Sequence, residues 1–159
     1  MRRLKKVAFD KRKNAGLYWY KVRNPVRILV SGLILAFAKY FPSLSAKRGL
    51  LRLVGAKVGK NVSLAPSTID PLFPDLISIG DNVMIGWDVM ILTHEIKGNE
   101  FRKGEVIIGE NATIGARSVV LAGVTIGKNA VVEACSLVNK DVKDGEIVGG
   151  VPIKKISLK

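Results

Sequence analysis

The sequence predicts one domain built as an all-β solenoid, with a helical segment before it. Three observations predict this fold: an apolar repeat of six residues, glycine and asparagine at recurring positions of that repeat, and a leading stretch, residues 1–57, that lacks it. A chain of 159 residues with 48% hydrophobic content is long enough to bury one core.

The repeat is clearest from Ile108, where six hexads follow one another without an insertion: IGENAT, IGARSV, VLAGVT, IGKNAV, VEACSL and VNKDVK. The first position of each hexad is β-branched, and the fifth is small or β-branched. Both positions have the same parity, so in an extended segment their side chains point to the same side. An amphipathic helix would space its apolar residues by 3.6 instead. Such hexapeptide repeats are typical of parallel β-helices.

The pattern extends upstream through VGKNVSLAPSTI and ISIGDNVMIGWDVMIL, with two interruptions. The first is the proline-rich stretch DPLFPD, which begins at Asp70. The second follows His94, the only histidine, where Glu95 falls on a core position and the pattern returns at Val106. Because insertions in a solenoid leave from one corner and often form the binding face, we expect a loop beside His94.

Residues 1–57 predict helices. Asn24 and Pro25 are typical of an N-cap and a first helical residue. Helical spacing then places apolar side chains on one side, namely Val26, Leu29, Val30, Leu33 and Phe37. A second helix is predicted over residues 45–54, ended by Gly55. Residues 26–41 would reach about 24 Å as a helix, which is too short to cross a hydrocarbon core of roughly 30 Å. We expect the helices to cap the open end of the solenoid.

Basic residues are concentrated in the first part of the chain. Residues 1–60 contain 16 Lys and Arg and one acid, Asp10, for a net charge of +15, whereas residues 61–159 contain 10 bases and 12 acids, for −2. Such asymmetry favours a polyanionic partner, and we expect an anionic membrane surface. Nucleic acid is not expected, since Tyr18, Trp19 and Tyr20 adjoin rather than being spaced as stacking platforms. The alternatives are a solvated basic arm or packing on the solenoid.

Cys135 is the only cysteine, so no internal disulfide can form and a reducing compartment is favoured. We find no cleavage site of a secretory signal peptide and expect a cytoplasmic protein, peripheral at the inner membrane surface if the basic segment binds lipid.

The repeats resemble the hexapeptide-repeat acyltransferases, in particular the maltose and galactoside O-acetyltransferases. The motifs that carry the resemblance are IGDNVMIG, ILTHE, IGENATIGARSVVLAGVTIGKNAVVEACSLVNKDV and IVGGVPIKKI, which cover most of residues 58–156. The resemblance implies a left-handed parallel β-helix with three strands in each 18-residue coil. We divide the chain into a basic helical segment (residues 1–57), the β-helix (58–145) and a C-terminal tail (146–159). The resemblance also implies a homotrimer with active sites between subunits and acetyl-CoA as the donor.

His94 falls where the resemblance places the catalytic histidine. An imidazole, with an ordinary pKa of about 6.5, suits removal of the acceptor's hydroxyl proton at neutral pH. A structural histidine on the loop stem is the alternative. Asp70 is a candidate to orient His94 across the subunit interface or to bind an acceptor hydroxyl, although it also suits a turn before Pro71. The sugar acetyltransferases have an asparagine-containing segment here, whereas this chain reads LAPSTID, so the acceptor is left open.

For the donor, the resemblance places the pantetheine arm against Gly115, Ala116 and Ala134, and the phosphates near lysines of the tail, Lys140, Lys154 and Lys155. Small residues permit close approach to the backbone, and lysines offer point charges to phosphate. Lys154 and Lys155 could equally belong to a solvated tail. Trp87 is expected to serve packing or a subunit contact, and Cys135 has no expected catalytic role.

The predicted function is transfer of an acetyl group from coenzyme A to a hydroxyl of a sugar or related acceptor. The alternatives are N-acylation of an amino sugar and a non-enzymatic trimeric scaffold. No metal is expected: the hexapeptide carbonic anhydrases need three histidine zinc ligands, and this chain has one histidine. A nucleotidyltransferase is not favoured, because no nucleotide-binding domain precedes the repeats.

Overall fold

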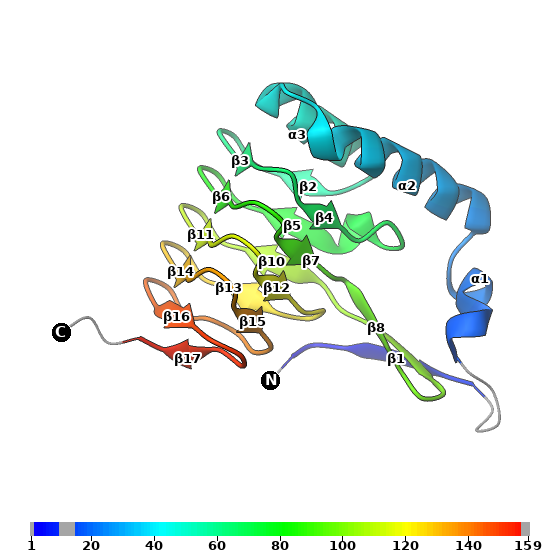
Figure 1. Cartoon of the computed structure of the whole chain (residues 1–159). Helices are drawn as coiled ribbons and strands as arrows, with labels where there is room; N and C mark the ends of the chain where they lie inside the picture. Colours follow the sequence, from blue (N-terminus) through cyan, green and yellow to red (C-terminus); the bar gives the residue numbers. More distant parts are fainter. Residues whose placement is uncertain (1, 10–14, 157–159) are drawn as a thin grey trace.

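Three sheets, parallel except for the strand nearest the C-terminus, form the sides of a prism in the computed structural model, which describes residues 2–9 and 15–156 (Figure 1). The chain visits the sheets in turn, so each strand pairs with strands one coil away. The first sheet holds β2 (Lys57–Val58), β5 (Ile77–Ile79), β10 (Val106–Ile108) and β13 (Thr125–Ile126). The second holds β3 (Ser63–Leu64), β6 (Met84–Ile85), β11 (Thr113–Ile114), β14 (Val131–Val132), β16 (Ile147–Gly149) and β17 (Lys154–Lys155). The third holds β4 (Thr68–Ile69), β7 (Met90–Ile91), β12 (Val119–Val120) and β15 (Leu137–Val138).

The interior of the prism is filled by the positions that the repeat predicts. Ile85, Ile114 and Val132 lie in register on successive coils of the second sheet, and all three side chains are buried. The fifth-position residues Ala112 and Ala130 are buried as well. The six-residue periodicity is therefore confirmed as the pattern of an extended core.

One corner of the prism carries a ladder of asparagines. Asn61, Asn82, Asn111 and Asn129 have φ between 54° and 58°, a left-handed conformation that asparagine tolerates better than most residues. Each side-chain amide donates to the next along the stack, at 3.3, 3.2 and 3.1 Å. The recurring asparagines thus close the turns and also join neighbouring coils.

The N-terminal helices start and end close to their predicted positions. A 3₁₀ turn, η1 (Ala15–Tyr18), and α1 (Trp19–Val22) lead to α2 (Pro25–Tyr40) and α3 (Leu44–Leu53). Asn24 Oδ1 accepts from the Val26 N–H at 2.9 Å, which confirms the N-cap. Ser43 caps α3, and Gly55, with φ of 103°, follows its end.

Helix α3 covers the first coil and takes the place of a coil that would precede it. Its basic side chains donate to outward carbonyls: Lys47 to Leu64 (3.1 Å), Arg48 to Val62 (3.1 Å) and Arg52 to Val58 (2.9 Å). In the next coil, the equivalent carbonyls of Ile85, Val83 and Ile79 accept backbone N–H groups from the first coil. Three of the N-terminal basic side chains therefore satisfy backbone carbonyls that the open end of the sheets would otherwise leave unpaired.

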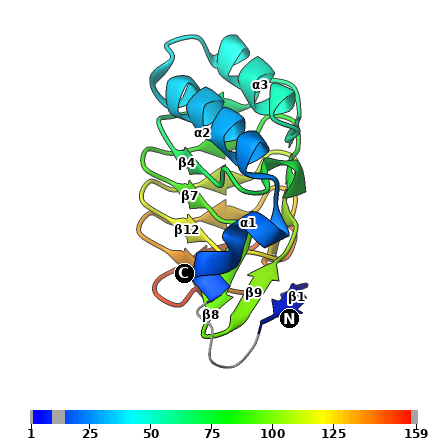
Figure 2. The same cartoon turned by 90° about the vertical axis from the view of Figure 1, so that its right-hand side faces the viewer.

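The interruption after His94 is an arm of paired strands, not the loop that we expected. Strands β8 (His94–Lys97) and β9 (Glu100–Lys103) form an antiparallel hairpin, and β1 (Lys5–Ala8) pairs with β9 as a third strand (Figures 1 and 2). The prediction that residues 1–57 are helical is thus wrong for β1. Its partner lies more than 90 residues away in sequence, so nothing in the local pattern KKVA indicates the pairing.

The carboxylate of Glu95 forms ion pairs with two arginines. Its Oε2 accepts from Arg2 Nη1 at 2.6 Å, and its Oε1 lies 3.6 Å from Arg102 Nη1. The acid on a predicted core position therefore belongs to the arm, outside the prism.

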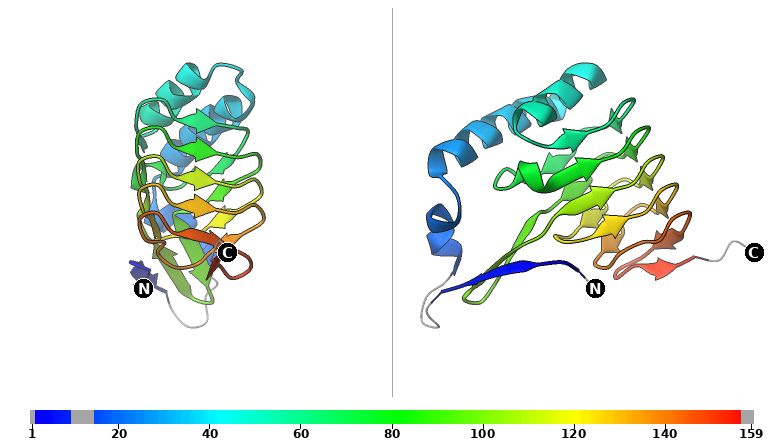
Figure 3. Two further views of the ribbon diagram at one scale, coloured as in Figure 1. Left: turned by 90° about the vertical axis from the view of Figure 1, so that its left-hand side faces the viewer. Right: turned by 180° about the vertical axis from the view of Figure 1, so that it is seen from behind.

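The tail continues the stack beyond residue 145. Strand β16 adds to the second sheet in parallel with β14, and β17 turns back antiparallel to β16 (Figure 3). A remaining short 3₁₀ turn, η2 (Pro74–Leu76), lies in the first interruption. The predicted segments that include residues 1, 10–14 and 157–159 extend outside the described residues.

Candidate active site

The two interruptions of the repeat leave the prism at the same corner, on successive coils. In the third sheet, Ile69 of β4 lies in register with Ile91 of β7. Asp70 directly follows the first of these strands, and His94 lies three residues after the second. The fold therefore brings together an acid and a histidine that the sequence separates by 24 positions.

Asp70 is a fully buried carboxylate that accepts five hydrogen bonds. Oδ2 accepts from His94 Nδ1 at 2.5 Å, from the Thr93 hydroxyl at 2.7 Å, and from the backbone N–H groups of Thr93 (2.9 Å) and His94 (3.1 Å). Oδ1 accepts from the Leu72 N–H at 2.9 Å. Asp70 thus closes the turn before Leu72 and also fixes the imidazole of His94 in the same chain, not across a subunit interface as we expected.

The charge of Asp70 determines which ring nitrogen of His94 is available to accept a proton. Burial by itself would raise the pKa of the Asp70 carboxyl, but hydrogen bonds from His94 and Thr93, with the charge of His94, outweigh it, and the pKa lies below its ordinary value. A charged carboxylate only accepts, so the neutral imidazole carries its proton on Nδ1 and a lone pair on Nε2. None of the hydrogen bonds among the described residues uses Nε2, and the side chain is 21% exposed.

Two buried phenylalanines, one from each interruption, hold the imidazole ring. Phe101 of β9 stacks on it with centroids 5.3 Å apart and planes 4° apart. Phe73 meets it edge to face at 6.4 Å and also contacts Phe101 at 5.9 Å. Lys103 Nζ lies 4.6 Å and Arg23 Cζ 5.1 Å from the centroid of Phe73. The ring is therefore fixed by packing as well as by Asp70.

Sequence reasoning missed Phe73, Phe101 and Lys103. A signal was available: Phe73 and Phe101 are the phenylalanines within the two interruptions, and a large aromatic side chain outside the repeat needs its own place to be buried.

The small residues predicted for the pantetheine arm, Gly115, Ala116 and Ala134, lie at another corner, between the second and third sheets. The register of the second sheet places Trp87, Ala116 and Ala134 at equivalent positions of successive coils. Trp87 and Ala134 are exposed, and Ala116 is half-buried. A Cβ on Gly115 would lie 2.4 Å from the Ala134 nitrogen, so stacking of the coils is enough to explain this glycine.

The tail lysines are split between two sheets. Lys154 pairs with Gly149 and Lys155 with Val148, both on β17 of the second sheet. Lys140 follows β15, in the third sheet. All three lysines are exposed.

The structure does not bring this column of small residues against His94 in a single chain. The column precedes the strands of the third sheet, whereas His94 follows the end of β7 in that sheet. Each chain therefore presents the two predicted halves of the site at two different corners of the prism. Among the described residues, no cluster of three or more His, Cys, Asp or Glu side chains could hold a metal ion.

Comparisons with known proteins agree with the repeat. Residues 105–140 match the family model described as bacterial transferase hexapeptide (six repeats). The chain is 41% identical over 136 residues to "Putative acetyltransferase YvoF" of Bacillus subtilis (strain 168), which covers 84% of this chain and 79% of that protein. It is 38% identical over 87 residues to galactoside O-acetyltransferase of Escherichia coli (strain K12), covering 50% of this chain and 43% of that one.

Solved structures share the fold. The hexapeptide-repeat-containing acetyltransferase VCA0836 from Vibrio cholerae superposes with a TM-score of 0.67, at 22% identity, over 92% of this chain and 96% of that one. A structure of VCA0836 complexed with acetyl coenzyme A gives 0.60, at 22% identity, over 80% and 84%.

Proposed function

The chain belongs to the hexapeptide-repeat acetyltransferases, and on that premise we propose that it moves an acetyl group from acetyl-CoA to a hydroxyl of a sugar or related acceptor, with His94 as the general base. A relative that matches most of the chain carries an acetyltransferase name, and a partial relative is a galactoside O-acetyltransferase. The observation that carries the proposal is the 2.5 Å hydrogen bond between His94 Nδ1 and Asp70 Oδ2.

The proposed chemistry follows from the tautomer that Asp70 favours. Acetyl-CoA supplies an acetyl carbon activated as a thioester. Nε2 of His94 accepts the proton of the acceptor's hydroxyl while the hydroxyl oxygen bonds to the acetyl carbon. The bond between the acetyl carbon and the sulfur of coenzyme A then breaks. The departing thiolate then takes the proton from Nε2, which leaves an acetyl ester, free coenzyme A and a neutral His94. Asp70 stays charged and stabilises the imidazolium during the step, so it acts through His94 as a positioning residue.

We propose that the prism winds as a left-handed β-helix and assembles as a homotrimer. Large apolar side chains are exposed along one part of the prism: Met84 (55%), Trp87 (63%) and Met90 (38%). Because His94 and the Ala116–Ala134 corner lie apart within one chain, a neighbouring copy would complete the site. In that site, Gly115, Ala116 and Ala134 would admit the pantetheine arm, and Lys140, Lys154 and Lys155 would attract its phosphates.

The experiment is turnover of His94→Ala with acetyl-CoA and a panel of galactosides, maltose and amino sugars. We expect the variant to fold, to bind coenzyme A by calorimetry, and to lose roughly 10²–10⁴ in kcat, the usual contribution of a general base. The matched control is Lys97→Ala, an exposed residue on the same strand of the arm, which should turn over like the parent.

Undiminished turnover by His94→Ala would show that another group is the base. The products distinguish a hydroxyl acceptor from an amine acceptor, because alkaline hydroxylamine cleaves an acetyl ester and leaves an acetamide intact.

A further inference from the structure

Helix α2 is apolar on two opposite faces. Its inner face packs on α3 and β4 and buries Ser31, Leu35 and Ala38. Its outer face carries large side chains spaced by three and four residues, and each is at least half exposed: Val26, Leu29, Val30, Leu33, Phe37 and Tyr40. These six residues are the apolar stripe. A helix in water keeps charged or polar residues on the side away from its core, so the stripe indicates a second apolar environment.

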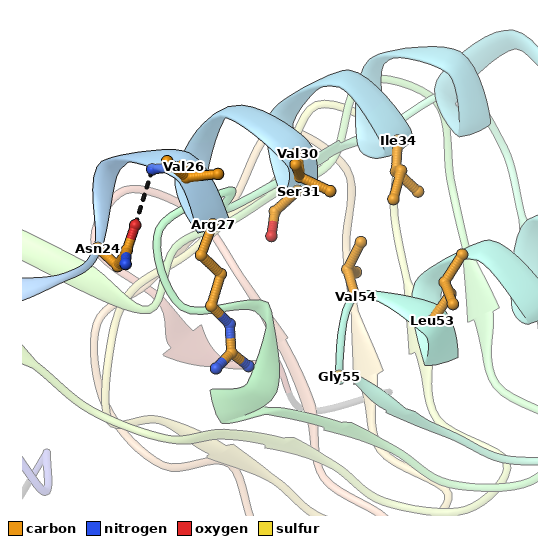
Figure 4. A pocket seen from close by; sticks show the side chains of 9 residues that line it. All are labelled: Asn24, Val26, Arg27, Val30, Ser31, Ile34, Leu53, Val54 and Gly55. Carbon is orange, nitrogen blue, oxygen red and sulfur yellow. Dashed lines mark hydrogen bonds between the residues drawn. The ribbon is translucent and has the colours of Figure 1, made fainter.

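A groove widens the stripe toward α3. It has a volume of about 590 Å³ and is walled by Val26, Val30, Ile34, Leu53 and Val54 (Figure 4). Arg27 projects from α2 at one end of it, as Figure 4 shows. The groove therefore combines apolar walls with one cationic group at its edge.

The surroundings of the stripe are positively charged. No Asp or Glu occurs between residues 15 and 60. Lys47, Arg48 and Arg52 are bonded to the carbonyls of the first coil. Two further cations lie beside the stripe: Arg27 lines the groove, and Lys39 Nζ lies 5.5 Å from the centroid of the Tyr40 ring and 3.4 Å from Thr68 Oγ1. The nearby carboxylate of Asp75 is paired with Arg23. Contact between equivalent stripes of two copies would bring these like charges together. An apolar stripe edged by cations and free of carboxylates is complementary to the surface of an anionic lipid bilayer.

We propose that α2 lies in the plane of an anionic membrane surface, with the apolar stripe in the lipid and Arg27 and Lys39 among the phosphates. No helix in residues 2–9 and 15–156 is long and apolar enough to cross a membrane. At 16 residues, α2 is about 24 Å long, a length suited to an in-plane helix. Docking of this kind is independent of the chemistry at His94.

The test uses the full chain with two kinds of vesicle, one of phosphatidylcholine alone and one of phosphatidylcholine mixed with phosphatidylglycerol. We expect co-sedimentation with the anionic vesicles only, weakened by salt. Leu29→Ser/Leu33→Ser/Phe37→Ser should lower the affinity by at least about ten-fold, since three large apolar side chains no longer enter the lipid. Arg27→Gln/Lys39→Gln should lower it by about five-fold for each charge.

The control is Val151→Ser, an equally exposed apolar residue beyond the other end of the stack, which should bind vesicles like the parent. Thermal melts establish that each variant is folded. The proposal is overturned if the parent ignores anionic vesicles or binds both kinds equally, or if the triple variant binds like the parent. It is also overturned if the triple variant changes the oligomer mass while the parent binds no lipid, because the stripe would then be an interface between copies.

Discussion

The regular coils and the two interruptions use different kinds of residue for different purposes. In the coils, side chains such as Ile85 and Ile114 repeat in register and are buried, and the backbone of each coil bonds to the next. In the interruptions, Asp70 and His94 depart from the repeat and meet each other, with Phe73 and Phe101 packed around the ring. In this molecule the regular repeat provides stability, whereas the candidate catalytic residues lie where the repeat is interrupted.

The largest expected effect is on folding and comes from the coils. Ile114→Asp would place a carboxylate in the dry centre of the prism, at a cost of several kcal/mol, comparable to the whole stability of a domain of this size. We expect loss of the cooperative unfolding transition in circular dichroism. Thr113→Asp, on the adjacent outward position, should fold; if both variants fold alike, the assignment of the repeat to the core is incorrect.

The next effect is on catalysis and comes from the interruptions. Asp70→Asn keeps the shape of the side chain, and its carbonyl oxygen can still accept from Nδ1, but the variant lacks the negative charge that stabilises the imidazolium. Turnover should fall by about 10²–10⁴, as for other acids that orient a catalytic histidine. Steady-state kinetics check this, and a fall in kcat with unchanged coenzyme A binding separates the positioning role from a folding defect. An unchanged kcat would show that Asp70 only closes the turn and does not position His94 for catalysis.

A smaller effect is expected at the capped end of the prism. Lys47→Met removes the donor to the Leu64 carbonyl and should lower the free energy of unfolding by about 1–3 kcal/mol, the cost of an unsatisfied buried acceptor. Urea titration measures it, with the exposed Lys60→Ala as control. An unaltered urea midpoint in Lys47→Met would mean that α3 does not replace a coil energetically.

The smallest effect is the acid dependence of stability. The pKa of Asp70 is lowered in the folded state, so its contribution is complete above the unfolded pKa of about 3.9 and is lost as the pH falls through the lower folded value. Urea midpoints of the parent should therefore fall more steeply below about pH 4 than those of Asp70→Asn. Parallel curves would show that the Asp70 carboxylate is not preferentially stabilised in the folded chain.

The coils could be predicted from the sequence because their order is local and repeated. The six-residue period determines the strands through residues close in sequence. In the same way, Asn24 before Pro25 marks the start of α2, and Gly55 marks the end of α3. His94 and Asp70 were identified as candidates, although their contact was only one of several interpretations. Strand β1 and the Phe73–Phe101 cluster could not be placed, because their partners are distant in sequence and no repeat fixes the register.

The most direct measurement is the position of the imidazole proton. His94 is the only histidine in the chain, so nitrogen NMR of the untagged protein labelled at histidine gives one pair of ring signals. Couplings to the carbon-bound ring protons distinguish Nδ1 from Nε2. At a pH where the ring is neutral, we predict a protonated Nδ1 and an unprotonated Nε2. A parent protein with its proton on Nε2 would contradict the claim that the two interruptions meet to make His94 a base.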